Sequence, residues 1–276
     1  MIDTQKMDQL SASLSLMRRL PPKNVEQNLT GLLNLLPDQM DELLQRIDQP
    51  LEEETDPETG RKYLRCDYNR DGDSYRSPWS NKYHPPIEDG FLPSEELRPI
   101  EIEANELFDA YRELYYEGGT SSVYLWDLDD GFAGCFLVKK AVTTGTIKGT
   151  WDAIHVVEAH EDAADATKAA YKLTTTVMLG MDVTGDKFGA CDLAGSLTRQ
   201  AEKADTIGAG KSHISNIGRM IEAMEGDMRS NLNELYLAKT REIVSNIRGN
   251  EGPKLSNEHV SALNAAIKGH TAPTIP

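Results

Sequence analysis

The stretch that decides the fold is residues 212–248, SHISNIGRMIEAMEGDMRSNLNELYLAKTREIVSNIR. Apolar residues recur in it at spacings of three and four, which predicts one continuous helix face. They are Ile214, Ile217, Ile221, Met224, Met228, Leu232 and Leu235. Ser212 is suited to cap the start of the helix and Gly249 to end it. The 36 residues 213–248 would reach roughly 54 Å as a straight helix, so we expect the far end to need a second chain to cover it.

Before this helix the hydrophobic period changes to that of strands. Asp130-Gly131 separates two strand-like runs, 123–126 and 132–138, and is typical of a hairpin turn. Further strands are expected at 147–158, 171–181 and 188–199. Five sequential strands with short connections predict an antiparallel meander over which the long helix packs.

The first half of the chain is predicted to be mainly helical. Residues 4–48 read as short helices broken at Pro21-Pro22 and Pro37-Asp38, which favours a small bundle. Residues 49–93 change character: the acidic run from Glu52 to Glu58 is expected to form an exposed loop, and Pro and Gly recur as far as Pro93. A helix then starts near Ser94 and ends at Gly118-Gly119. Its expected apolar positions are Leu97, Ile102, Leu107, Leu114 and Tyr115.

Composition narrows the function classes. The 276 residues carry a net charge of −16, which argues against nucleic acid as the main partner. Three widely spaced cysteines suit free thiols in a reducing compartment. No leader and no apolar run of membrane-spanning length is recognisable, so a cytosolic protein is expected.

Two motifs resemble ligand sites without completing them. Residues 67–73, DYNRDGD, match the first half of a calcium-binding loop, but Pro78 stands where the closing glutamate belongs. Gly210-Lys211-Ser212 ends like a phosphate-binding loop, but Asp205 occupies the place of its first glycine. We interpret the first as a polar turn and the second as the start of the long helix.

Catalysis, metal binding and cofactor binding are not predicted. Among six histidines, His155 and His160 lie close together in the sequence, with no cysteine at zinc spacing. We expect both to be at the surface or partly buried. No nucleophile–base pattern is present.

The basic residues allow two interpretations. Lys139-Lys140 follow the second strand, and other basic residues lie along the long helix: Arg219, Arg229, Lys239, Arg241 and Arg248. They form either a solvated helix face with pairs such as Glu225–Arg229 or a cluster for an acidic partner. The sequence leaves both open.

Several stretches together resemble the β subunit of the heterodimeric F-actin capping protein family. These stretches are LMRRLPP (16–22), CDYNRDGDSYRSPWSNKY (66–83), EGG (117–119), SSVYLWD (121–127), GSLTRQ (195–200) and NLNE (231–234). They are spread in order over most of residues 10–248, and the run 66–83 is long and unusual.

The resemblance implies an α+β fold with a stalk of three helices (1–50), a globular loop region and helix (51–120) and an antiparallel sheet (121–200). The long helix (212–248) then crosses the sheet, and a linker and amphipathic tentacle (249–276) follow. It further implies an obligate partner α subunit whose sheet continues this one.

In the family the heterodimer caps actin filament barbed ends without calcium, severing or catalysis. Basic residues and the apolar face of the tentacle make the contact. The matching candidates here are Lys139, Lys140, Arg229, Leu255, Val260, Leu263 and Ile267. The implied partners also include CARMIL-type motif proteins, myotrophin and acidic phosphoinositides, at the cortical actin cytoskeleton.

Two other functions are weighed against capping of cellular filaments. One is a structural subunit that caps a short actin-like filament inside a larger assembly. The other is a calcium-regulated enzyme or sensor, for which the incomplete loop at 67–73 is the basis.

Overall fold

The structure is a computed structural model. It describes residues 2–162, 164–165, 167–185, 189–208 and 212–234, with 238, 241, 242 and 245. The chain divides into two compact units, Met1–Glu225 and Gly226–Pro276. The elements described below belong to the first unit, except that the last helix continues into the second.

Three helices pack together at the N-terminus, as the proline breaks predict. They are α1 (Ile2–Met17), α2 (Val25–Leu35) and α3 (Met40–Arg46), with 3-10 turns at Pro22–Asn24 and Pro37–Gln39. The apolar faces of the three meet around Leu43, which is fully buried. Met17 and Leu29 pack into this cluster from the other two helices.

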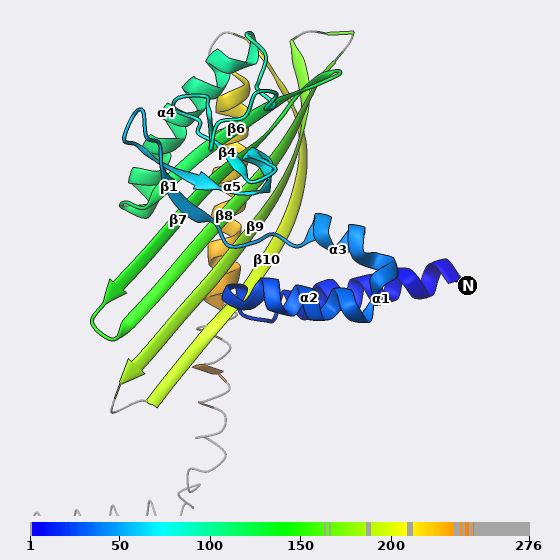
Figure 1. The fold of residues 1–276 in the computed structure, drawn as a ribbon, viewed down its shortest axis with the longest axis vertical. Coiled ribbons are helices and arrows are strands. Elements are labelled where there is room, and N and C mark those ends of the chain that lie inside the picture. Colours follow the sequence, from blue (N-terminus) through cyan, green and yellow to red (C-terminus); the bar gives the residue numbers. More distant parts are fainter. Residues whose placement is uncertain are drawn as a thin grey trace, which may run out of the picture. The chain divides into compact units, whose positions relative to one another are not determined.

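The five-stranded antiparallel meander is confirmed (Figure 1). Its strands, in the spatial order of the chain, are β6 (Thr120–Leu128), β7 (Gly131–Thr144), β8 (Ile147–Glu161), β9 (Lys168–Gly185) and β10 (Gly189–Thr206). The first turn lies one residue earlier than predicted: Leu128 pairs with Gly131, so Asp129-Asp130 form the loop. Gly131 instead begins β7, where a Cβ atom would clash with the carbonyl oxygen of Ala159.

The loop expected from Glu52 to Glu58 is wrong at its start, which forms a strand, and segment 49–93 is not a continuous loop. It contains five short strands, β1 (Glu52–Thr55), β2 (Lys62–Arg65), β3 (Arg70–Asp71), β4 (Ser74–Arg76) and β5 (Tyr83–His84). Asp56, expected in the exposed acidic run, is buried. It accepts hydrogen bonds from the Ser77 hydroxyl (2.6 Å) and the Glu58 backbone N–H (2.8 Å). Burial raises the pKa of Asp56, but these and neighbouring donors lower it well below its usual range.

Two layers cover the sheet. One face packs against α4 (Leu97–Tyr116) and the first part of α5 (His213–Asn233). Ile214, Ile217 and Ile221 are buried there, which confirms that part of the predicted helix face. The other face packs against Leu51 and Leu64, around β1 and β2.

The buried face of α4 differs from the predicted one. Of the expected apolar positions, only Leu97 is buried, whereas Leu107 and Leu114 are 51% and 79% exposed. The buried face carries other apolar residues and, beside them, polar ones, among them Glu101 and Asn105. A buried polar side chain needs hydrogen-bond partners, and here those partners are the backbone of the adjacent strand.

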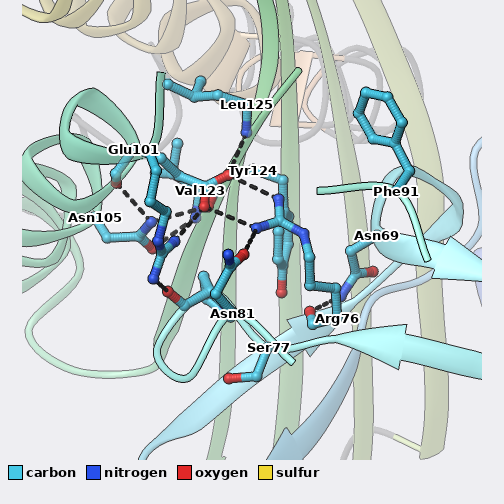
Figure 2. A network of polar contacts seen from close by, with 12 residues as sticks. Asn69, Arg76, Ser77, Asn81, Phe91, Glu101, Asn105, Val123, Tyr124 and Leu125 are labelled. Carbon is cyan, nitrogen blue, oxygen red and sulfur yellow. Dashed lines mark hydrogen bonds and ion pairs between the residues drawn. The ribbon is translucent and has the colours of Figure 1, made fainter. Parts of the chain in front are cut away.

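Two side chains of α4 close the outer edge of the sheet at β6. Asn105 accepts a hydrogen bond from the Val123 N–H and donates one to the Val123 carbonyl oxygen, both at 2.9 Å. Glu101 accepts from the Leu125 N–H at 2.7 Å. Figure 2 shows both residues reaching the strand backbone, with Arg76 approaching Glu101 from β4. The side chains therefore occupy backbone groups that another strand would use.

Glu101 also forms a buried ion pair with Arg76. Both terminal nitrogens of Arg76 contact its carboxylate, at 2.8 and 2.7 Å, and Arg98 donates to it from the same helix. Arg76 is fixed in turn by the Asn81 amide oxygen at 2.7 Å. A bidentate, hydrogen-bonded pair of this kind tolerates burial because both charges are compensated.

We expect Asn105→Ala to lower the free energy of unfolding by about 2–4 kcal/mol, because the buried N–H and carbonyl groups of Val123 lose their hydrogen-bond partner. Glu106→Ala changes the exposed neighbour on α4 and should cost under about 0.5 kcal/mol. Urea unfolding of both variants measures the difference. Equal stability of the two would show that water replaces the amide at the edge.

Candidate functional site

The candidate lysines of the sheet point to opposite faces. Lys139 and Lys140 are consecutive residues of β7, and side chains alternate along a strand. Lys139 lies on the face of β1 and β2, and Lys140 on the face of α4. The two ammonium groups therefore do not form one basic patch.

Lys139 is part of a cross-strand ion pair. It stands opposite Asp152 of β8, and its Nζ lies 2.9 and 3.1 Å from the two carboxylate oxygens. Asp152 also accepts a hydrogen bond from the Leu51 N–H at 2.9 Å. Burial raises the pKa of Asp152, and Lys139 and Leu51 only partly oppose that effect. The pair links the sheet to the segment that leads into β1.

Lys140 binds the C-terminal end of α4. Its Nζ donates to the carbonyl oxygens of Tyr116 and Glu117, both at 2.8 Å. A cation at this position satisfies carbonyl groups that the helix leaves unpaired and interacts favourably with the helix dipole. Lys140 is half-buried, so a part of its side chain faces solvent.

The other candidates lie in later parts of the chain. Arg229 lies on α5 in the second compact unit, where it is half-buried. Leu255, Val260, Leu263 and Ile267 lie outside the described residues, as do most residues of the predicted helix after Asn233. The structure thus positions Lys139 and Lys140 and leaves the tentacle a sequence prediction.

Glu225 of α5 is a buried carboxylate that the sequence pattern did not indicate. It accepts hydrogen bonds from the Tyr111 hydroxyl at 2.7 Å and from the Tyr116 hydroxyl, both on α4. His155 Nε2 lies 3.0 Å from Oε1 of this carboxylate, and His155 Nδ1 lies 3.0 Å from the Thr175 hydroxyl. His155 was expected at or near the surface, but it is fully buried because it lies on the face of β8 that the helices cover.

This network binds both helices to the sheet. Burial raises the pKa of Glu225, but the hydrogen bond and charge of His155, with the two tyrosine hydroxyls, bring it below its ordinary value. His160, the other histidine of the pair, is half-buried, and its Nδ1 lies 2.8 Å from a carboxylate oxygen of Asp130 in the hairpin turn. The two histidines therefore have unrelated surroundings.

The two motif-like runs have structural roles. Asn69 of the run 67–73 is buried; its amide oxygen accepts from the Cys66 N–H at 2.9 Å and its amide nitrogen donates to the Arg76 carbonyl at 2.8 Å. Ser212 accepts from the Ser215 N–H at 3.2 Å, as a helix N-cap does. Gly210 and Lys211 lie outside the described residues.

Two kinds of feature are absent from the described residues. No group of three or more His, Cys, Asp or Glu side chains among them is arranged to hold a metal ion. No helix among them is long and apolar enough to cross a bilayer.

The second edge of the sheet contrasts with the first. β10 is 18 residues long and is the last strand in the sheet order. On its outer side, the Ser196 N–H donates to the carbonyl oxygen of Arg18 at 3.0 Å, at the end of the helical stalk. Within the described chain no strand pairs with β10 on that side. A long strand with an unpaired edge is a template for a strand of another chain.

We expect Lys139→Met to destabilise the chain by about 2–4 kcal/mol, because Asp152 is left buried without its cation. Adding Asp152→Asn removes the charge and keeps an acceptor for Leu51, so the double variant should recover most of that loss. Thermal unfolding compares the three proteins. A double variant no more stable than Lys139→Met would contradict the ion-pair role.

Glu225→Gln should make the free energy of unfolding depend less on pH in the acid range. Since the folded pKa of Glu225 is depressed, its stabilisation is complete above the unfolded value of 4.5 and is lost as the pH falls towards the folded value. The variant should be less stable near neutral pH by about 2–4 kcal/mol, and the gap to the unmodified chain should narrow below pH 4.5. Urea unfolding at stepped pH measures it, with the exposed Glu222→Gln as control; a gap constant with pH would refute the assignment.

Comparison with known proteins identifies the family. The family model described as F-actin capping protein, beta subunit, matches residues 10–244. F-actin-capping protein subunit beta of Drosophila melanogaster is 54% identical over 244 residues, covering 88% of each chain. The subunits of Caenorhabditis elegans and Dictyostelium discoideum are 54% and 50% identical; the alignments cover 94% and 92% of this chain and 97% of each relative. The chain belongs to the F-actin capping protein beta subunit family.

Proposed function

We propose that the chain forms a heterodimer with a capping protein alpha subunit and that the heterodimer caps the barbed ends of actin filaments. The observation that carries this proposal is the family match over residues 10–244 at about half identity to relatives named as beta subunits. In this proposal the protein blocks subunit addition and loss without catalysis and without calcium.

The two sheet edges support the heterodimer. Asn105 and Glu101 occupy the β6 backbone, whereas β10 presents a long outer edge. A partner sheet can therefore extend this one at β10 and not at β6. Pairing there would cover the half-buried Leu193 and Leu197 and bring the partner beside the stalk residue Arg18.

Capping in this proposal uses separate contacts that act together. Lys140 or Lys139, with Arg229, would supply positive charge. Leu255, Val260, Leu263 and Ile267 would form the apolar face of a tethered helix. Linked contacts bind more tightly than either alone, because the first holds the second at high effective concentration.

The regulators and location implied by the resemblance belong to the same proposal. They are CARMIL-type motif proteins, myotrophin and acidic phosphoinositides, acting on a cytoplasmic protein at cortical actin. The rival role, capping a short actin-like filament inside a larger assembly, predicts the same heterodimer with a different filament.

Seeded actin elongation tests the function. The chain, co-expressed with an alpha subunit, should block growth from barbed ends, and truncation after Gly252 should weaken the block chiefly through faster dissociation. A chain that lacks only residues 274–276 serves as the control for truncation itself. A stable heterodimer that leaves elongation unchanged would refute capping of free filaments and favour the rival role.

A further inference from the structure

A row of apolar side chains on α4 faces solvent. Leu107 and Leu114 are 51% and 79% exposed, and the half-buried Ile100 precedes Leu107 by seven residues. Residues seven apart lie on the same side of a helix two turns on, so the three form a row of roughly 21 Å along α4. This row lies to one side of the buried face that contains Glu101 and Asn105.

Leu107 of this row also lines an apolar groove between α4 and α5. Phe108 of α4 and Phe136 of β7 line it, with their rings edge to face at a centroid distance of 5.4 Å. Ile214 and Gly218 line it from α5. A Cβ atom built on Gly218 would meet nothing within 4 Å, so this wall is open to an approaching side chain.

The rim of the groove is acidic. On α4, the exposed Glu96 and Glu103 precede Ile100 and Leu107 by four residues each. Residues four apart are neighbours on a helix surface, so both carboxylates lie beside the row. Across the groove, α5 presents the exposed Glu222 one turn after its open wall. Both helices therefore contribute negative charge to the rim.

Two arginines of these helices are held by other partners. Arg219 of α5 is held by Asn216 and lies 3.7 Å from Asp205 of β10. Arg112 of α4 is paired with Asp109 at 3.0 Å and is almost fully buried. Neither arginine neutralises the carboxylates at the rim.

We propose that this groove docks an amphipathic helix of a partner protein, with an apolar stripe flanked by lysine or arginine. The heptad spacing of Ile100, Leu107 and Leu114 matches the stripe of a helix lying along α4. A strand is not suited, because the backbone groups of α4 and α5 are used within the helices. A second copy of this chain is also unsuited, because its own α4 presents the same carboxylates.

The test uses a fluorescent 21-residue peptide with leucine at heptad positions and lysine and arginine beside them, titrated with the heterodimer. A matched peptide carries glutamate in place of every basic residue. We expect saturable binding of the basic peptide and at least about tenfold weaker binding of the acidic one, equivalent to about 1.4 kcal/mol. Failure of the basic peptide to bind, or equal binding of both, would overturn the proposal.

Paired variants locate the binding. Leu107→Ser with Leu114→Ser should weaken binding about tenfold, whereas Ile102→Ser, 45% exposed on another side of α4, should leave it unchanged. Gly218→Leu should fill the groove and block binding, with Gly226→Leu, equally open and also on α5, as its control. Circular dichroism and co-purification of the alpha subunit verify folding of each variant. Equal effects within either pair would place the peptide elsewhere and refute the groove.

Discussion

The backbone of β6 is closed on its outer side by Asn105 and Glu101 of α4, and much of the structure depends on that closure. Glu101 cannot leave the strand without abandoning Arg76, whose guanidinium is buried against it. A shift of α4 would therefore leave the buried Arg76 guanidinium without its carboxylate, at a cost of several kcal/mol, whereas Arg98 would move together with Glu101. The helix, the edge strand and β4 are fixed as one block.

A second carboxylate gives α5 a similar restraint. Glu225 joins α5 to His155 in the sheet and to Tyr111 and Tyr116 on α4. Both helices over this face are thus held by buried acids whose hydrogen-bond partners come from other elements. The groove between the helices is consequently a preformed surface, because its two walls are fixed to the same sheet. A partner binding there would lose little free energy to ordering the site.

The sequence predicted the elements that depend on periodicity. The five strands follow from alternation and turns, and the buried positions of α5 from three- and four-residue spacing. It failed for most of α4, where Ile102, Leu107, Leu114 and Tyr115 were expected on the apolar face and are exposed. The polar residues Glu101, Asn105 and Arg112 lie on the buried face, and hydropathy cannot identify a polar group whose partner lies on another element. Their regular spacing at four and seven was the available signal.

His155 lies between apolar residues of a strand, which indicates burial, but Glu225 is 70 residues away and its pairing depends on the tertiary fold. The opposite directions of Lys139 and Lys140, in contrast, follow from the period of a strand and could have been predicted.

Because Lys139 and Lys140 point to opposite faces of the sheet, they cannot contribute equally to binding an acidic filament end in the proposed heterodimer. Lys139 already compensates Asp152, so moving it to actin would leave a buried carboxylate unpaired. Lys140 gives up only carbonyl contacts that water can replace, because the end of α4 is at the surface. Of the two lysines, Lys140 is therefore the one available to a partner at low cost. One such contact is weak on its own, so the proposed capping would also need charge from elsewhere, including the alpha subunit, and the predicted apolar tail.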